Sequence, residues 1–443
     1  MSSINALVSW PAAPLTDSLV RKALDQLSLT ISFVDKAQAK SVTPLLQWCT
    51  YDDMDHELMH FNRKTVLSSS YTFRKALIRK HFLSRIIHSY TTKNPTSILK
   101  NSVPRTFEIE ISFADELDEL WTDELWELGA ELDNGKSWWI LKPGMADRGS
   151  GIRVFHSKEG LQEIFEEFEE QSDEENEDGD GNTQRETSVV TSQLRHFVVQ
   201  EYIDTPLLFD PTETTKQNPK IDELVGRKFH LRVYCVAKAD IELYVYDRIL
   251  ALFSSVPYTS LSARDGGDEG ADIDLRPHLT NTSLQTELGE SNVRLLDELE
   301  NCHIISGEEN VKFTTSDIKS LRADVAEVLG DVFKAALQNP VHFQALPNAF
   351  ELYGVDFVVS HEPSNPDKKL HVKLLEINAE PAIELTGPRL TWFLEDLFKR
   401  IGQVCVEPFI VHKEEGAKSW HVGETKYNFI KCLDENIRAM GSN

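Results

Sequence analysis

Cysteine is scarce in this sequence, and long apolar runs are missing. The five cysteines lie far apart and form no C-x-x-C pair, so they predict neither a disulfide framework nor a zinc site. Isolated thiols favour a reducing compartment, and we predict a cytoplasmic protein. No apolar segment approaches the length needed to cross a bilayer, and the first residues carry no basic stretch of the kind found in secretion signals. We therefore expect no membrane partner.

Basic residues are also few. The 46 lysines and arginines are outnumbered by 72 aspartates and glutamates, which gives a net charge of −26. This charge repels a phosphate backbone and so argues against direct nucleic-acid binding. An acidic protein tail would be repelled as well, unless a local basic patch such as Arg74 to Arg85 acts within the Debye length of about 8 Å. The same patch also fits the solvated face of an amphipathic helix.

The length and the hydrophobic content of the chain suffice for several domains. The chain has 443 residues, of which 40% are hydrophobic, and at about 150 residues per domain this predicts roughly three domains. Residues 6–34 alternate strand, helix and strand, which indicates a small α/β unit at the start. By contrast, the acidic stretch from Gln171 to Ser188 has hardly an apolar residue. We predict that this stretch is a disordered loop, and we assign it no partner.

The segment KLHVKLLEINAEPA, residues 369–382, predicts a strand that ends in polar side chains. Because side chains alternate along a strand, Glu376 and Asn378 share one face. Carboxylate and amide oxygens suit Mg²⁺ that is held jointly with phosphates. The neighbouring segment LYGVDFVVS predicts a partner strand, from which Asp356 adds a second carboxylate. Taken alone, the pattern also fits ordinary polar residues at a strand exit.

A second segment, GRKFHLRVYCV, predicts a strand with an unusually cationic face. Lys228, His230 and Arg232 alternate with apolar residues and so lie on one side. Three such groups repel one another unless an anion lies between them, and phosphate is the natural candidate for Arg and Lys. A solvated edge face is the alternative.

A third segment, WWILKPGMADRGSGIRVF, predicts a strand that ends at Lys142 and enters a glycine-rich loop. Glycines allow backbone N–H groups to surround an anion, and a lysine at the start of the loop would reach the phosphates from the side. The segment is neither a Walker A motif nor G-x-G-x-x-G. A plain glycine hairpin is the alternative.

Taken in order, these segments resemble the ATP-grasp ligases and, among them, the tubulin-tyrosine ligase family. The matching stretches are RKALIRK, WWILKPGMADRGSGIRVF, FVVQEYIDTPLLFD, GRKFHLRVYCV, HLTN, LYGVDFVV and LLEINAEPA, which run from Arg74 to Ala382. The combination of QEYIDTPLL with RKF-x-x-R, HLTN and E-x-N is specific to this family among ATP-grasp enzymes. The first 70 residues and the tail after Gly402 carry no matching motif.

The resemblance implies an α+β ATP-grasp fold in three parts. A small N-terminal α/β domain would span residues 1–70, a central domain residues 71–203, and a C-terminal domain residues 204–443. The central and C-terminal domains would clamp the cofactors, which are ATP and one or two Mg²⁺ ions.

Positions that match the family's motifs supply the candidate site. The nucleotide-binding set that the resemblance implies is Lys75, Lys142, Gln200, Glu201, Tyr202, Ile203, Lys228, His230, Arg232, His278, Thr280 and Asn281. Lys75 and Lys142 would contact the phosphates, while backbone groups of Glu201 and Ile203 would read the adenine edge. Lys142 and Arg232 would be catalytic. The implied metal ligands are Asp356, Glu376 and Asn378.

The family's chemistry needs no nucleophilic side chain. A substrate carboxylate attacks the γ-phosphate of ATP, and an amine traps the acyl phosphate as an amide. Metal ions, Lys and Arg stabilise the negative charge of both steps. The resemblance thus implies an enzyme that adds a free amino acid, tyrosine or glutamate, to a protein carboxylate such as the C-terminus of α-tubulin or another acidic tail.

Two positions depart from the family's pattern and leave an alternative open. His230 stands where an aspartate is typical, which affects the ribose contact. Leu252 stands where an arginine would face the acceptor carboxylate, and the nearest arginine in that strand is Arg248. The alternative is a nucleotide-binding interaction or scaffold protein that keeps the fold without ligation, similar to fungal relatives associated with P-bodies. A ligase that acts on a small metabolite is a third possibility.

Overall fold

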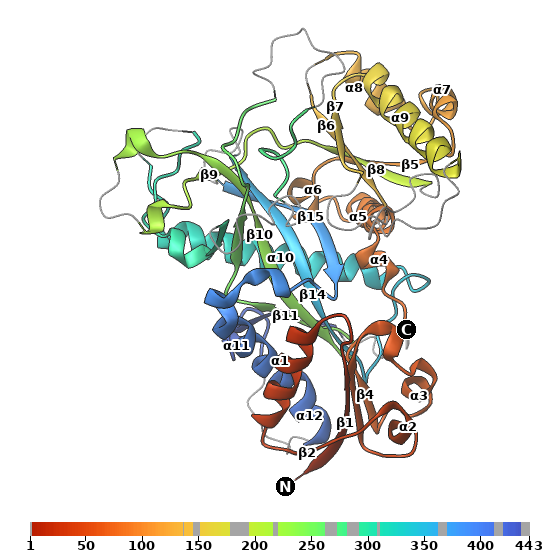
Figure 1. Ribbon diagram of the computed structural model, residues 1–443. Coiled ribbons are helices and arrows are strands. Elements are labelled where there is room, and N and C mark those ends of the chain that lie inside the picture. The colour runs from red at the N-terminus through yellow and green to blue at the C-terminus, as the bar shows by residue number, and fades with distance from the viewer. Residues whose placement is uncertain are drawn as a thin grey trace.

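The computed structural model describes residues 2–135, 137–144, 151–177, 195–215, 220–261, 273–280, 292–307, 311–361, 370–411 and 420–435. Within these residues, three β-sheets with helices packed on their faces make up the fold (Figure 1). The same residues contain no helix that is both long and apolar enough to span a membrane.

The first sheet is small and parallel, with the strand order β2-β1-β3-β4. Its strands are β1 (Ser3–Ser9), β2 (Thr30–Phe33), β3 (Leu45–Cys49) and β4 (Val66–Ser68), and its helices are α1 (Pro14–Asp25), α2 (Lys36–Ala39) and α3 (His56–Phe61). Every residue of β3 is buried, as expected for a parallel strand that is covered on both faces. The small α/β unit predicted from residues 6–34 is confirmed.

The second sheet is antiparallel, with the order β5-β8-β6-β7. It comprises β5 (Thr106–Glu110), β6 (Trp139–Pro143), β7 (Arg153–Phe155) and β8 (His196–Glu201), with α7 (Leu117–Leu120), α8 (Trp126–Leu132) and α9 (Lys158–Glu177) beside it (Figure 1). Phe165 and Phe168 of α9 pack on Phe197 of β8. The backbone of α9 continues to residue 177, into the acidic stretch that the sequence predicts to be disordered, and residues 178–188 lie outside the described part.

The third and largest sheet contains two long strands, β10 (Arg227–Lys238) and β14 (Phe350–His361). β14 pairs antiparallel with β10 on one side and with β15 (Leu370–Ala379) on the other. The remaining strands are β9 (Leu208–Phe209), β11 (Glu242–Tyr246), β12 (Leu250–Phe253), β13 (Val293–Leu295), β16 (Thr425–Lys426) and β17 (Phe429–Asp434).

Helices pack against both faces of the large sheet. α10 (Thr315–Leu337) begins with a capping box in which Thr314 and Asp317 exchange hydrogen bonds, and it buries an apolar stripe that includes Leu321, Val325 and Leu329. α11 (Thr391–Ile401) packs against α1 of the first sheet, and α12 (Glu407–Ile410) follows it. One apolar cluster therefore joins the first sheet to the large one.

Three short segments link the sheets. α4 (Lys75–Ile78), α5 (Lys80–Lys93) and α6 (Leu99–Ser102) contribute Leu77, Ile86 and Leu99 to the core that contains α10, and α5 also contacts β5 and β8. Residues 75–102, which the sequence assigns to the central domain, thus pack on the large sheet too. The domain boundaries near residues 70 and 203 stay a prediction.

Candidate functional site

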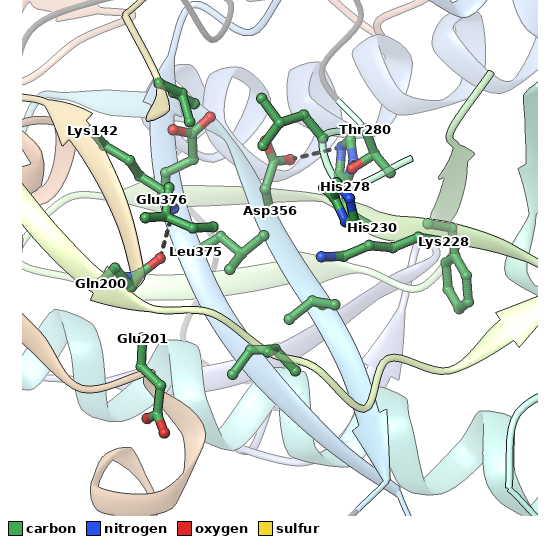
Figure 2. Close-up of a pocket in the computed structure, with 16 residues that line it drawn as sticks. Lys142, Gln200, Glu201, Lys228, His230, His278, Thr280, Asp356, Leu375 and Glu376 are labelled. Carbon is green, nitrogen blue, oxygen red and sulfur yellow. Dashed lines mark hydrogen bonds and ion pairs between the residues drawn. The ribbon is translucent and has the colours of Figure 1, made fainter. Parts of the chain in front are cut away.

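A cavity that is partly open to solvent lies between the antiparallel central sheet and the large sheet (Figure 2). Its walls come from β6 and β8, from β10, from residues 278–280, and from the paired strands β14 and β15. The polar residues that line it are Lys142, Gln200, Glu201, Lys228, His230, His278, Thr280, Asp356 and Glu376. Apolar walls with a few convergent polar groups are the usual form of a small-molecule site.

Strand register brings three charged residues into one row. Arg232 of β10 lies opposite Asp356 of β14, and Asp356 lies opposite Glu376 of β15. Asn378, two residues further along β15, lies opposite Gly354 and shares the face of Glu376. The predicted pairing of the two segments that carry Asp356 and Glu376 is therefore confirmed. Side chains that are remote in sequence meet because these strands are neighbours.

The carboxylate of Asp356 forms a two-point ion pair with the guanidinium of Arg232. Nε of Arg232 donates to Oδ1 at 2.5 Å and Nη2 donates to Oδ2 at 3.0 Å. Burial by itself would lower the pKa of Arg232, but the charge and hydrogen bonds of Asp356 raise it above its usual value. Arg232 is therefore a permanent positive charge that is fixed in direction.

Glu376 contacts a different cation. Its Oε2 lies 3.2 Å from Nζ of Lys80, and its Oε1 accepts a hydrogen bond from the amide of Asn378 at 3.2 Å. Burial favours the neutral carboxyl, yet the charges of Lys80 and Lys142 lower the pKa of Glu376 below its usual value. The residue is therefore ionised and available as a ligand for a cation.

Two lysine ammonium groups are buried in the same cavity. Lys142 donates to Oε1 of Gln200 at 2.6 Å, and Nζ of Lys228 lies 4.4 Å from the ring centre of Tyr202. Burial is the main reason that the pKa of Lys142 is lowered to about 8 and that of Lys228 to about 7. The charge of Lys142 further lowers the pKa of Lys228. An anion bound between the two lysines would offset both the cost of burying their charges and their mutual repulsion.

His230 closes the inner wall of the cavity. Its Nδ1 lies 2.6 Å from Oγ1 of Thr280, while its buried Nε2 has no hydrogen-bond partner and lies 3.6 Å from Oδ1 of Asp356. Burial lowers the pKa of His230, so the ring is neutral at pH 7. Leu252 of β12 lies opposite His230 and is also buried. Arg248 does not replace the arginine expected near Leu252, because it binds Asp396 of α11 at 3.1 Å.

Comparison with known proteins identifies the family. The family model of the tubulin-tyrosine ligases matches residues 60–413. The chain belongs to the tubulin-tyrosine ligase family. It is 36% identical over 435 residues to a probable tubulin-tyrosine ligase, PBY1, of Saccharomyces cerevisiae, and this match covers 95% of the chain and 53% of that protein. The chain thus spans about half of the length of that relative.

Other members of the tubulin-tyrosine ligase family are also similar. A probable tubulin-tyrosine ligase of Schizosaccharomyces pombe is 34% identical over 402 residues, which cover 87% of this chain and 88% of that protein. Tubulin glycylase 3B of Drosophila melanogaster is 24% identical over 313 residues, which cover 67% of this chain and 32% of that protein.

A solved structure confirms the predicted fold class. The C-terminal domain of K. lactis Pby1, an ATP-grasp enzyme that interacts with the mRNA decapping enzyme Dcp2, superposes with a TM-score of 0.64 and 28% identity. The match covers 98% of this chain and 99% of that one. The chain therefore has the α+β ATP-grasp fold of the family.

Most residues that family resemblance predicts for the site line the cavity, but Lys75, Tyr202, Arg232 and Asn378 do not. Lys75 is exposed at the first turn of α4, because Ala76 and Leu77 occupy the buried side of that turn. Lys80, which the sequence interpretation did not single out, reaches Glu376 instead. Lys80 stands five residues further along the same RKALIRK motif, and the contact of Lys75 with the phosphates stays a prediction.

Glu201, Tyr202 and Ile203, at the end of β8 and directly after it, have side chains with different contacts. The side chain of Glu201 points away from the charged row (Figure 2) and lies 3.3 Å from Arg105, so only its backbone faces the cavity region. Ile203 contributes to the wall, whereas the hydroxyl of Tyr202 contacts Nδ1 of His278 at 2.9 Å. Asn281 and loop residues 145–150 lie outside the described residues.

The donor set of Asp356, Glu376 and Asn378 fits Mg²⁺. Its oxygens are hard ligands, they share one face of β14 and β15, and they adjoin the cationic cavity where phosphates would complete the coordination. Within the described part of the chain, no group of three or more His, Cys, Asp or Glu side chains is placed to hold a metal ion. Coordination of Mg²⁺ by these two carboxylates and one amide together with a nucleotide stays a prediction.

Proposed function

We propose that this chain is an ATP-dependent carboxylate-amine ligase that adds an amino acid, tyrosine or glutamate, to a protein carboxylate such as the C-terminus of α-tubulin. The observation that carries the proposal is that Asp356, which is paired with Arg232, and Glu376 line the same cavity as the buried ammonium groups of Lys142 and Lys228. Fixed positive charge next to two carboxylates suits a magnesium nucleotide. The family and its tubulin-modifying members support the choice of substrate.

Two bond exchanges account for the reaction. First, an oxygen of the acceptor carboxylate bonds to the γ-phosphorus of ATP, the bond to the bridging oxygen breaks, and ADP leaves. Next, the amine nitrogen bonds to the acyl carbon, phosphate leaves, and the nitrogen releases a proton. Both steps concentrate negative charge, which preorganised cations stabilise.

Each residue has a distinct part in this scheme. Lys142 and Lys228 would hold phosphate oxygens, and Arg232, whose guanidinium is paired with Asp356, would stabilise the charge of the transferring phosphoryl group. Asp356, Glu376 and Asn378 would hold one or two Mg²⁺ ions, which would neutralise the phosphates. Lys80 keeps the carboxylate of Glu376 ionised and oriented.

The decisive assay measures ADP release with Mg-ATP, tubulin and either tyrosine or glutamate, together with mass spectrometry of the tubulin tails. We expect release of ADP in step with tail extension, and loss of both in Arg232→Ala. Tail extension that survives Arg232→Ala would exclude the assigned catalytic role.

A second candidate function is a nucleotide-dependent interaction protein without ligation. Leu252 favours it, because an apolar side chain occupies the position opposite His230 where an arginine would hold an acceptor carboxylate. The interaction of K. lactis Pby1 with Dcp2 supports a protein partner of that kind. Tight binding of Mg-ATP by calorimetry, without ADP release for any acceptor, would select this function over ligation.

A further inference from the structure

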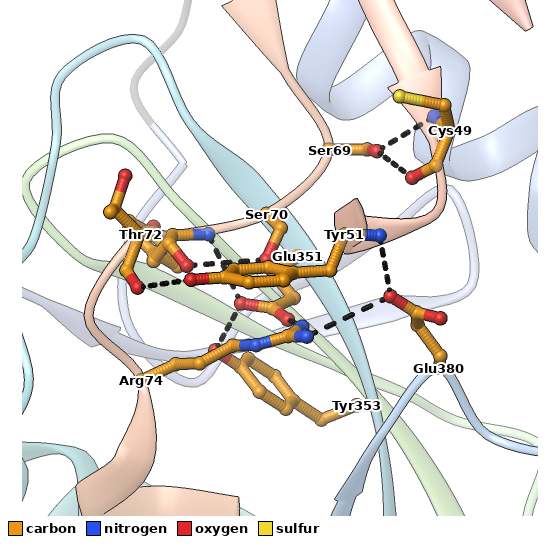
Figure 3. Close-up of polar contacts among 10 residues, drawn as sticks. Cys49, Tyr51, Ser69, Ser70, Thr72, Arg74, Glu351, Tyr353 and Glu380 are labelled. Atoms are coloured by element: carbon orange, nitrogen blue, oxygen red, sulfur yellow. Dashed lines mark hydrogen bonds and ion pairs between the residues drawn. The ribbon is translucent and has the colours of Figure 1, made fainter. Parts of the chain in front are cut away.

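Arg74 lies where the first sheet, the large sheet and the end of β15 meet. It directly precedes α4 and forms an ion pair with Glu351 of β14, while its Nη2 lies 3.7 Å from Oε1 of Glu380 after β15 (Figure 3). The ring centre of Tyr51, which follows β3, lies 4.2 Å from the guanidinium carbon. The side chain of Arg74 is only 11% exposed, so these contacts fix the direction of a buried cation.

Glu351 is held from several sides as well. Its Oε2 accepts the hydroxyl of Tyr353 at 2.7 Å and the backbone N–H of Tyr71 at 3.2 Å, while its Oε1 pairs with Arg74. Burial by itself would lower the pKa of Arg74, but the charge of Glu351 raises it above its usual value. The pair of Arg74 and Glu351 is therefore a fixed anchor between the first sheet and β14.

The backbone of Glu380 adopts an unusual conformation directly after the strand that carries Glu376 and Asn378. The φ of Glu380 is 50°, in the left-handed region that residues with a Cβ rarely adopt. The next residue is Pro381, and a residue before a proline usually adopts an extended conformation with negative φ. The positive φ therefore costs free energy and persists only where the surrounding structure holds it.

The side chain of Glu380 supplies two contacts that hold this conformation. Its Oε1 accepts the backbone N–H of Tyr51 at 2.9 Å, and the same oxygen faces the guanidinium of Arg74 (Figure 3). Hydrogen bonds to a carboxylate are stronger than those between neutral groups. The turn after β15 is thus tied to the end of β3 and to the start of α4, which are remote from it in sequence.

The turn at Glu380 packs on the strand pair that carries Asn378. Asn378 lies two residues before Glu380 and pairs with Gly354 of β14. Pro381 packs so closely on Gly354 that a Cβ there would lie 2.7 Å from the Cβ of Pro381. Because Pro381 directly follows Glu380, a change of φ at Glu380 would move Pro381 off Gly354 and loosen the strand pair at Asn378.

We propose that Glu380 is a positioning residue of the metal site. Held by Tyr51 and Arg74, it keeps the turn after β15 in the conformation that directs Asn378 and Glu376 to the nucleotide. Glu380 acts through the backbone of this turn and not as a metal ligand. The inference rests on the magnesium-nucleotide site of the proposed function, but not on ligation.

Calorimetric titration of the full chain with ATP, with Mg²⁺ and with a chelator, tests this role. The readout is the magnesium ratio, which is the dissociation constant of ATP with the chelator divided by that with Mg²⁺. In Glu380→Ala this ratio should fall by roughly 10-fold, because alanine loses both contacts and still bears the cost of a positive φ. In Glu380→Gly it should fall by about 2-fold at most, because glycine adopts a positive φ without steric cost. Binding of ATP with the chelator should not change, because Lys142 and Lys228 are intact.

A milder variant and a matched control complete the set, and thermal unfolding checks that each variant is folded. Glu380→Gln keeps an acceptor for Tyr51 but loses the attraction of Arg74, so its magnesium ratio should lie between those of the unmodified chain and Glu380→Ala. The control applies the same pair of changes to Asn301, which has a φ of 67°, is exposed and does not line the nucleotide cavity. Asn301→Ala and Asn301→Gly should leave the magnesium ratio unchanged.

Three results would overturn the positioning role. The first is an unchanged magnesium ratio in both Glu380→Ala and Glu380→Gln. The second is an equal loss in Glu380→Ala and Glu380→Gly, since the charge of Glu380 rather than the turn would then set the ratio. The third is a loss in Asn301→Ala as large as that in Glu380→Ala, which would mark a general effect of destabilisation.

Ligation assays on the same samples separate this proposal from the ligase proposal. The expected order of magnesium ratios without ligation for any acceptor would reject the ligase and keep the role of Glu380. Ligation by the unmodified chain, together with an unchanged magnesium ratio in the Glu380 variants, would reject the role of Glu380 and keep the ligase. No binding of Mg-ATP by the unmodified chain would reject both.

Discussion

The cavity that Lys142 and Lys228 line carries charge of opposite sign to a second cavity, which lies between the parallel first sheet and the large sheet. The nucleotide cavity holds Lys142 and Lys228 beside the row of Arg232, Asp356 and Glu376, whereas the second cavity is lined by carboxylates and aromatic rings. In the cavity with the two lysines, burying the ammonium groups costs free energy, which a bound anion would offset. In the second, the hydrogen-bonded carboxylates are neutralised only in part.

The largest expected effect comes from breaking the charged row of the nucleotide cavity. Asp356→Ala leaves the guanidinium of Arg232 buried without its two-point partner. We expect the free energy of unfolding to fall by about 3–5 kcal/mol in urea denaturation. The control is Asp17→Ala, which removes an exposed pair with Arg21 and should cost about 0.5 kcal/mol or less. A loss below about 1 kcal/mol for Asp356→Ala would show that the ion pair of Arg232 and Asp356 does not stabilise the fold.

A smaller effect is expected from Lys228→Met, which should keep or raise the stability of the fold but lower the affinity for Mg-ATP. Lys228→Met removes a buried ammonium group that has no ion pair among the described residues, so the thermal unfolding midpoint without nucleotide should stay equal or rise. Affinity for Mg-ATP should fall by roughly 10- to 100-fold, because a charged hydrogen bond is lost. Lys220→Met, at an exposed position, is the control. A lower unfolding midpoint would mean that Lys228 stabilises the fold rather than the nucleotide.

The smallest effect is a pH dependence of nucleotide affinity. In the free protein the pKa of Lys228 is about 7 and that of Lys142 about 8, and bound phosphates favour the charged forms and so raise both values. Binding is therefore strongest below about pH 7 and weakens as pH rises through 8 and beyond, with proton uptake on binding. Calorimetry at pH 8 in buffers of different ionisation enthalpy measures the uptake. Proton release instead of uptake would contradict the assigned contacts.

Sequence reasoning reached the family and the fold class, and most of the site residues that it named line one cavity. Alternation along the segments of Arg232, Asp356 and Glu376 predicted the faces of the strands, because a strand's period is fixed by its backbone. The pairing of the two strands that carry Asp356 and Glu376 followed from their apolar pattern and their proximity in the chain. The order of β10, β14 and β15, which sets the row, depends on long-range pairing that a local pattern does not contain.

Other features could not be read from the sequence for physical reasons. Lys75 and Lys80 share one basic motif, and only the break between α4 and α5 decides which of them reaches Glu376. The second cavity is formed by residues 10–16 and 380–384, which are more than 360 residues apart, as the contact between Thr16 and Glu384 shows. No motif marks such a place, because its chemistry arises from the packing of two sheets.

The magnesium dependence of ATP binding directly tests whether Glu376 and Asn378 hold the metal of an ATP site. The measurement is the dissociation constant of ATP, by calorimetry, for the unmodified chain and for the double variant Glu376→Gln with Asn378→Ala, each with Mg²⁺ and with a chelator. We expect the unmodified chain to bind ATP tightly only with Mg²⁺, and the double variant to bind ATP weakly both with Mg²⁺ and with the chelator. Binding of Mg-ATP by the double variant as tight as by the unmodified chain would contradict the assignment of the site.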